Sequence, residues 1–207
     1  MSLDGLIEID QALTLFINQF HTAASDRFWL FVSESSVWYP AYALIAGIFI
    51  WRLGWKRGLV AILTCVVMVV FMDQTSNLIK HTIARLRPCY TTSMIEGGLH
   101  YPELRGGFFG FFSGHSCNSF GFAICSWALL RADTRLKWRG YLCGALTWAA
   151  LVGLSRIMMG KHYAGDVLVG AAYGLFFGYL IALLGRVVIN KISPKPLSSA
   201  EGLTAQE

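Results

Sequence analysis

The chain has 207 residues, of which 55% are hydrophobic and only 14% are charged, and its formal net charge is +5. Soluble domains carry roughly 25% charged residues, so this chain has too few charges to cover a core with a solvated surface. The composition therefore excludes a soluble globular protein and favours one membrane-embedded domain. The 17 basic residues lie scattered between apolar runs, so we expect no nucleic-acid partner.

The chain starts with an amphipathic segment over residues 1–25. Apolar side chains recur roughly at helical spacing from Leu3 to Phe20, opposite polar ones. This pattern is typical of a helix that lies in the membrane interface. A sixth span from this segment is the lesser option, because Asp4, Glu8 and Asp10 fall within it.

Five stretches without Asp, Glu, Lys or Arg follow and mark candidate membrane spans. A helix needs about 20 mostly apolar residues to cross roughly 30 Å of hydrocarbon, so the shorter stretches must borrow flanking residues. A barrel would show short alternating segments instead. We predict an all-α polytopic membrane helix bundle of about five spans, near residues 36–53, 58–79, 114–131, 139–157 and 165–188.

These spans and the N-terminal segment are predicted to form a single domain over residues 1–193, since no internal repeat divides them. The tail at 194–207 contains Pro and several Ser residues and is predicted to be disordered. The oligomeric state stays open.

The basic residues of the loops predict the orientation in the membrane. Loops rich in Lys and Arg face the cytoplasm. Most basic residues follow the first, third and fifth spans: Arg52, Lys56, Arg57, Arg131, Arg135, Lys137, Arg139, Arg186, Lys191 and Lys195. Nearly all the others lie in the two loops of the opposite face, 80–113 and 156–164, where the rule disfavours them, so they need a separate explanation.

Three clusters supply that explanation, because each lies where a span meets the opposite-face loops. They are Lys80 with Arg87-Pro88, Ser113-Gly114-His115, and Ser155-Arg156 with His162 and Asp166. If the helix ends meet at one mouth, three cations and two imidazoles converge there. Arginine binds phosphate oxygens bidentately and lysine adds a point charge, so this pocket suits phosphate. The free N–H groups at the start of the third span add donors for the same oxygens.

The two histidines can divide the steps of a displacement at phosphorus. His162 and Asp166 are spaced i, i+4, so the carboxylate can hold one ring nitrogen and aim the other at phosphorus. This spacing predicts His162 as the nucleophile. His115, from another helix, can protonate the leaving oxygen and later take a proton from the attacking water.

These motifs, Lys80-x6-Arg87-Pro88, Ser113-Gly114-His115 and Ser155-Arg156-x5-His162-x3-Asp166, resemble the three-part signature of the type 2 phosphatidic acid phosphatase (PAP2) superfamily. That family includes integral-membrane lipid phosphatases and vanadium-dependent haloperoxidases. The resemblance implies that phosphate is bound by Lys80, Arg87, Ser113, Gly114 and Arg156. It also implies that His115 is the acid/base, that His162 becomes phosphorylated, that Asp166 orients it, and that no metal or other cofactor takes part. Where the family usually has Pro before Ser-Gly-His, this chain has Phe112.

We therefore expect an integral membrane lipid-phosphate phosphatase whose partner is a membrane lipid carrying a phosphate or pyrophosphate. Candidate substrates are undecaprenyl pyrophosphate, a lipid A phosphate and phosphatidate or phosphatidylglycerol phosphate. The orientation predicts a bacterial inner membrane with the active site on the periplasmic face. An anion channel or transporter is the alternative, although it would need no nucleophile. Metal-dependent hydrolysis is disfavoured because the three cations would repel a divalent ion, and a haloperoxidase is disfavoured by the membrane setting.

Other polar residues near the clusters have less specific roles. Arg85, Arg105 and Lys161 are expected as lipid-headgroup anchors rather than secondary substrate contacts. Asp73 lies inside the second span, where a carboxylate costs about 2.5–3.5 kcal/mol on insertion scales. Because it shares a helix face with Asn77 and Lys80, we expect a structural network beneath that lysine.

The five cysteines predict no metal site, since no CxxC spacing is present. Cys65, Cys125 and Cys143 are expected to be packing residues inside spans. Cys89 and Cys117 lie at the non-cytoplasmic mouth, where a disulfide is chemically allowed, although two separate thiols are the favoured interpretation.

Overall fold

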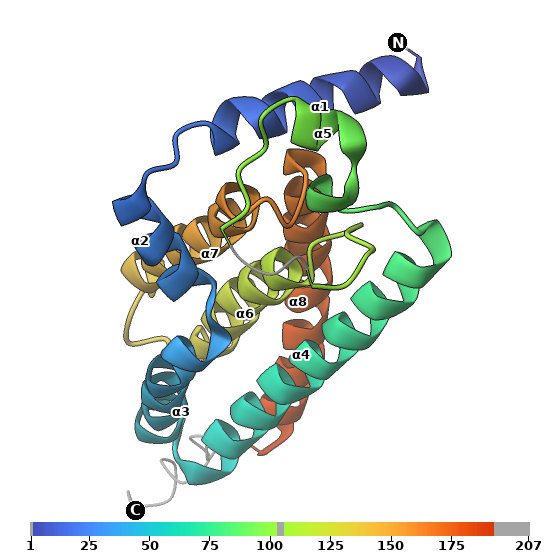
Figure 1. The fold of residues 1–207 in the computed structure, drawn as a ribbon. Helices are drawn as coiled ribbons and strands as arrows, with labels where there is room; N and C mark the ends of the chain where they lie inside the picture. Colours follow the sequence, from blue (N-terminus) through green and yellow to red (C-terminus); the bar gives the residue numbers. More distant parts are fainter. Residues whose placement is uncertain (1, 103–105, 193–207) are drawn as a thin grey trace, which may run out of the picture.

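The computed structural model describes residues 2–102 and 106–192 (Figure 1). Its helices are α1 (Leu3–Asn18), α2 (Ala23–Ser33), α3 (Tyr39–Leu53), α4 (Trp55–Ile83), α5 (Thr92–Glu96), α6 (Gly114–Leu130), α7 (Arg139–Met158) and α8 (Ala164–Ile192), with 3-10 turns η1 (Ser35–Trp38) and η2 (Pro88–Tyr90). Within these ranges there is no strand, only an isolated bridge between Leu86 and Phe109. The predicted all-α class is confirmed, whereas the tail at 194–207 and Arg105 lie outside the described residues.

All five predicted spans are helices in the structure, within a few residues of the predicted bounds. Four segments are long and apolar enough to cross a membrane: Ser35–Leu53, Trp55–Ile83, Arg139–Met158 and Ala164–Ile192. The remaining one, α6, has 17 residues and lies in the centre of the bundle, packed against α4, α7 and α8 (Figure 1). Because its neighbours surround it, most of its surface meets protein rather than lipid.

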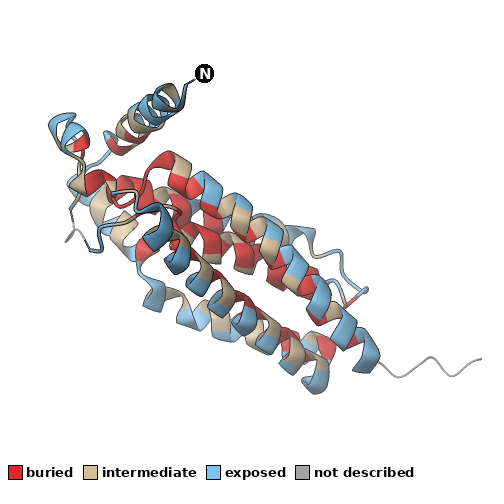
Figure 2. Cartoon of the chain, turned by 90° about the vertical axis from the view of Figure 1, so that its right-hand side faces the viewer, coloured by how far each residue is buried: buried red, intermediate tan, exposed pale blue. Residues whose placement is uncertain are grey.

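The lipid-facing surface is visible on the outer sides of the long helices. Figure 2 shows exposed residues along these outer sides and buried residues along the inner ones. Leu63, Val66 and Val70 of α4 and Phe176 and Leu184 of α8 are all exposed. Large apolar side chains gathered over such a surface are typical of a membrane contact.

Three glycines of α8 let it approach α6 very closely. A Cβ at Gly170, Gly174 or Gly178 would lie closer to a backbone oxygen of α6 than real Cβ atoms ever come. Small residues spaced by four along a membrane helix allow two backbones to meet in this way. The close packing places the start of α6 beside the start of α8, where Ser113 N donates to Asp166 O at 3.0 Å.

Helix α1 crosses one end of the bundle instead of running through it (Figure 1). With 16 residues it is shorter than a membrane span, so the structure gives no support to a sixth span. Its large apolar side chains, among them Leu13 and Phe16, are exposed, as expected for a helix at a membrane interface. Its polar residues Thr14 and Asn18 are buried against the protein rather than turned to water.

The loops that carry most of the basic residues meet at the opposite end of the bundle. There Asp133, which is buried, accepts from Arg52 Nη2 at 2.6 Å and from Arg135 Nε at 2.7 Å. This cluster ties the end of α3 to the loop between α6 and α7. The predicted cytoplasmic loops therefore share one end of the molecule.

Candidate active site

The three motifs come from segments far apart in sequence, and backbone hydrogen bonds join them at one end of the bundle. Gly110 N donates to Arg85 O at 2.9 Å, which pairs the chain after α4 with the loop before α6. Ser113 N donates to Asp166 O, which joins that same loop to the start of α8. These bonds hold the three motifs in a fixed mutual arrangement.

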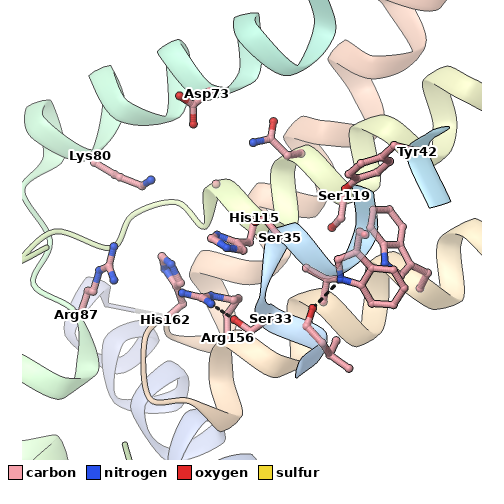
Figure 3. Close-up of a pocket in the computed structure, with 16 residues that line it drawn as sticks. Ser33, Ser35, Tyr42, Asp73, Lys80, Arg87, His115, Ser119, Arg156 and His162 are labelled. Carbon is pink, nitrogen blue, oxygen red and sulfur yellow. Dashed lines mark hydrogen bonds between the residues drawn. The ribbon is translucent and has the colours of Figure 1, made fainter. Parts of the chain in front are cut away.

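A cavity of about 280 Å³ lies between the motifs. Figure 3 shows the predicted cations and histidines around it: Lys80, Arg87, His115, Arg156 and His162. Lys80 comes from the last turns of α4, His115 from the first turn of α6 and Arg156 from the last turn of α7. The structure thus brings together residues that the sequence separates by up to 82 positions.

The start of α6 forms one wall of the cavity. Gly114 lines it, and Ser113, the N-cap residue, accepts from Ser116 N at 3.4 Å. A Cβ at Gly114 would lie 3.2 Å from Lys80 Nζ, so the glycine gives the ammonium group room beside the helix start. A helix N-terminus with a lysine beside it attracts anions through both its N–H groups and its dipole.

Arg156 is held from outside the three motifs. It is buried, and its Nη1 donates to Ser33 Oγ at the end of α2 (Figure 3). Three cationic side chains, Lys80, Arg87 and Arg156, therefore face one small cavity. This charge favours a multiply charged anion such as phosphate.

His162 lies in the short loop between α7 and α8 and is only 2% exposed. Burial, followed by the nearby cations Arg156, Arg87 and Lys80, lowers the pKa of His162 well below its ordinary value. This shift favours the neutral ring, which has the free lone pair that a nucleophile needs.

Asp166 is fixed through both of its carboxylate oxygens. Its Oδ1 accepts from Arg85 Nη1 at 2.7 Å, and its Oδ2 accepts from Tyr163 N at 3.1 Å. The same Oδ2 lies 3.7 Å from His162 Nδ1, which is beyond hydrogen-bond distance. Hydrogen bonds between catalytic groups can tighten in the complex with substrate.

Comparison with known proteins agrees with this geometry. The model of the PAP2 superfamily matches residues 58–188, which is more than half of the chain. A lipid A 4'-phosphatase of Bacteroides thetaiotaomicron is 33% identical over 192 residues, covering 92% of this chain and 83% of that protein. The chain belongs to the PAP2 superfamily.

Two further PAP2 proteins are similar over most of the chain. A lipid A 4'-phosphatase of Porphyromonas gingivalis is 26% identical over 180 residues, covering 86% of this chain and 74% of that protein. The crystal structure of a transmembrane PAP2 type phosphatidylglycerolphosphate phosphatase from Bacillus subtilis has a TM-score of 0.67 at 21% identity, covering 93% of this chain and 90% of that one. The fold is that of a PAP2 membrane phosphatase.

Arg85 and Lys161 are not the headgroup anchors that we expected for this PAP2 chain. Arg85 forms ion pairs with Asp166 and Asp10, both at 2.7 Å, and Lys161 is only 5% exposed. The expectation for Arg85 was wrong because a basic residue beside a membrane loop looks the same in sequence whether its partner is a headgroup or a distant carboxylate.

Gly110 lies beside Asp166 and His162, and the sequence motifs missed it. A Cβ there would lie 3.2 Å from Asp166 Oδ2 and 3.5 Å from His162 Nδ1. The missing side chain leaves room for the carboxylate and the imidazole to approach one another. A glycine set between two pairs of phenylalanines was the available signal.

The polar residues within α4 and the two cysteines near the cavity were also subjects of sequence predictions. Asp73 lines the cavity and accepts from Asn77 Nδ2 at 3.3 Å, so two of the three residues of the expected network are in contact. Cys89 and Cys117 are both buried and are not joined by a disulfide.

Proposed function

We propose that this PAP2 protein is a metal-independent lipid-phosphate phosphatase that removes a phosphate group from a sugar of an envelope glycolipid through a phosphohistidine intermediate. The observation that carries the proposal is a buried imidazole, His162, at a cavity that is also lined by three cationic side chains. An anion channel or transporter would need the cations but no such imidazole.

The reaction proceeds in two displacements at phosphorus. His162 Nε2 forms a bond to phosphorus while the bond from phosphorus to the leaving oxygen breaks, and His115 gives that oxygen a proton. Water then attacks the phosphohistidine, His115 takes a proton from it, and inorganic phosphate and free His162 are released. Lys80, Arg87 and Arg156 neutralise the charge that builds up on the phosphate oxygens in both steps.

The far wall of the cavity supports a sugar as the leaving group. Beyond His115 it combines polar side chains, Asp73 and Asn118, with the aromatic rings of Trp38 and Trp148. Among the described residues, Asn118 Oδ1 and Trp148 Nε1 are buried without a hydrogen-bond partner. A sugar presents hydroxyl groups and apolar faces, so it can pair with these atoms and pack on the rings. The similarity to lipid A 4'-phosphatases points to the same class of substrate.

Two apolar grooves beside α3 support a substrate that stays in the membrane. One, of about 330 Å³, lies between α3 and α7, and the other, of about 430 Å³, lies between α3 and α4. Tyr42 lines both grooves and also the catalytic cavity. A lipid can therefore place acyl chains on both sides of α3 while its headgroup reaches the cations.

Phosphate release in detergent micelles tests the substrate. We expect the purified protein to release phosphate from lipid A bisphosphate faster than from phosphatidylglycerol phosphate or undecaprenyl pyrophosphate. Activity should survive EDTA and be inhibited by vanadate, which mimics five-coordinate phosphorus. Activity lost in EDTA and restored by a divalent ion would overturn the metal-free mechanism, and a preference for either other lipid would overturn the glycolipid assignment.

Asn118→Ala tests the sugar-binding wall directly. Losing one hydrogen bond to the headgroup should lower kcat/KM for lipid A about 3- to 10-fold. The kcat/KM for phosphatidylglycerol phosphate should stay within about twofold of the parent value, since that headgroup has no sugar to contact this wall. An equal loss for both lipids would show that Asn118 supports the fold or the phosphate site instead.

His115→Ala tests the division of labour between the two histidines. With an aryl phosphate, whose leaving group departs as a stable anion, this variant should keep a stoichiometric burst of product while steady turnover fails. Acid-labile phosphate should then accumulate on His162. Parent-rate turnover of alkyl phosphates by this variant would remove His115 from the mechanism.

We further place the active site on the periplasmic face of a bacterial inner membrane, because the basic loops lie at the other end of the bundle. In a Cys143→Ser background, an impermeant thiol reagent should label Glu96→Cys in intact cells and leave Thr134→Cys unlabelled. Both positions are exposed; the first ends α5 and the second lies in the loop between α6 and α7, and these two segments lie at opposite ends of the molecule (Figure 1). The reverse pattern would move the active site to the cytoplasm.

A further inference from the structure

Arg85 bridges two carboxylates that come from opposite ends of the chain. Its Nη1 donates to Asp166 Oδ1 and its Nη2 to Asp10 Oδ2, both at 2.7 Å. Its guanidinium also lies over the ring of Tyr163, with Cζ 3.9 Å from the ring centroid. The Asp166 side chain is fully buried, whereas those of Asp10 and Arg85 are 15% and 25% exposed. Arg85 thus links α1 to the carboxylate beside His162.

Asp10 belongs to a polar face of α1 that binds both helices flanking the His162 loop. Asp10, Thr14 and Asn18 are spaced by four residues, so they lie on one face of the helix. Asp10 Oδ1 accepts from Gly165 N at 2.7 Å, and Thr14 Oγ1 accepts from Ala164 N at 2.9 Å.

These two bonds satisfy N–H groups in the first turn of α8, which have no partner within their own helix. Asn18 Nδ2 donates to Ile157 O at 2.9 Å and to Met158 O at 3.1 Å, at the end of α7. Helix α1 therefore holds the end of α7 and the start of α8, between which His162 is carried.

We propose that Asp10 is a positioning residue for the phosphatase reaction, acting through Arg85 on Asp166 and so on the ring of His162. This inference rests on the proposed function, because it takes His162 as the nucleophile.

The charges of this bridge explain why a second carboxylate is useful. One arginine faces two carboxylates, so Arg85 is shared, and Asp166 is not fully neutralised by it. Asp166 Oδ2 can then accept a hydrogen bond from the protonated Nδ1 of His162. The imidazole ring develops positive charge when its Nε2 bonds to phosphorus, and this charge strengthens the hydrogen bond. Asp10 also prevents Arg85 from turning both of its nitrogens toward Asp166 and drawing the carboxylate away from the ring.

Asp10→Asn separates positioning from simple support of α8. The asparagine keeps an oxygen that can accept from Gly165 N but loses the ion pair with Arg85. We expect kcat for the preferred lipid to fall about tenfold, while KM stays within about twofold of the parent value. A loss of similar size is seen in other proteins when a functional histidine loses the group that orients it. Thr14→Ala is the matched control, since it removes the neighbouring bond to α8 without touching Arg85. It should leave kcat within about twofold.

A double-mutant cycle tests whether Asp10 acts through Arg85. Arg85→Gln should lower kcat at least about 100-fold, because it leaves Asp166 buried without its cation. The double variant should be no slower than Arg85→Gln alone, since the path through Arg85 is already broken. All rates are taken per folded molecule, from gel filtration and thermal unfolding in detergent.

Two results would overturn the proposal: additive losses in the cycle, or a Thr14→Ala variant that slows as much as Asp10→Asn. Either result can be interpreted only if the parent protein is an active phosphatase and the His162→Ala variant is inactive. A parent without phosphatase activity, or an active His162→Ala variant, would contradict the proposed function itself and so be distinguished from failure of this inference.

Discussion

Arginine–aspartate clusters lie at both ends of this PAP2 protein, and their composition is reversed. At the loop end, one buried carboxylate, Asp133, accepts from two arginines, Arg52 and Arg135. At the catalytic end, one arginine, Arg85, donates to two carboxylates, Asp10 and Asp166. Both clusters join helices that lie far apart in the sequence.

The difference teaches what each cluster can do. Asp133 has an arginine on each oxygen, so its charge is satisfied and it acts as a tie between α3 and the α6–α7 loop. Asp166 shares Arg85 with Asp10 and has one oxygen near the ring of His162. A carboxylate in such a partly satisfied state can respond when charge develops on the imidazole. The loop-end cluster should therefore affect stability, and the catalytic-end cluster should affect rate.

The largest expected effect is that of His162→Ala. If His162 is the nucleophile, as proposed, its loss should lower kcat for every lipid phosphate by at least about 10⁴-fold, because no covalent route remains. Phosphate release and trapping of labelled phosphoenzyme would measure it. A variant that still forms acid-labile phosphoenzyme would show that the nucleophile lies elsewhere, and the catalytic-end cluster would lose its proposed role.

Gly110→Ala should have a smaller effect than His162→Ala. Its Cβ would crowd Asp166 Oδ2 at 3.2 Å and Arg87 Cγ at 3.1 Å, so the carboxylate must shift. Displacements of this size near reacting groups lower rates by about 10- to 100-fold. Gly107→Ala is the control, because a Cβ there meets nothing within 4 Å. Equal kcat values for the two variants would contradict a tight fit around Asp166.

The acid limb of the pH profile tests the charge balance at the catalytic end. Only neutral His162 can attack, so kcat/KM should rise as pH increases through its pKa. Because burial and the three cations lower that pKa, the limb should lie below about 6.5, the ordinary histidine value. Alkyl and aryl phosphates should give the same limb if it belongs to His162. A limb above pH 7, or one that moves with the substrate, would reject this assignment.

The smallest effect on rate is expected from Asp133→Asn. This change breaks the loop-end cluster and leaves two arginines without their carboxylate, so it should lower the free energy of unfolding by about 1–3 kcal/mol. Its kcat should stay within about twofold of the parent value, because the cluster lies at the opposite end from the cavity. Thermal unfolding in detergent beside a phosphate-release assay would measure both. A large loss of kcat with unchanged stability would remove the contrast between the two ends.

Much of the fold and of the phosphate site could be predicted because the relevant patterns are local. Runs without charges mark helices wherever lipid is the solvent, and helix ends place motif residues in the same end of the bundle. The motif residues Lys80, Arg87, His115, Arg156 and His162 do line one cavity. Even the Gly170, Gly174 and Gly178 spacing that sets the α6–α8 contact was present as a local repeat of small residues.

The partners of Arg85 and the direction of the polar face of α1 were decided only by the tertiary structure. Asp10 lies 75 residues from Arg85, and Thr14 lies 150 residues from Ala164, so no local period links them. In sequence, the acidic and amide side chains of α1 indicate a face turned to water. In the fold, Asp10, Thr14 and Asn18 meet N–H and C=O groups at the ends of α7 and α8 that have no partner within their own helices. A buried polar group gains more from such partners than a solvated one. Those partners exist only after the helix ends have been brought together.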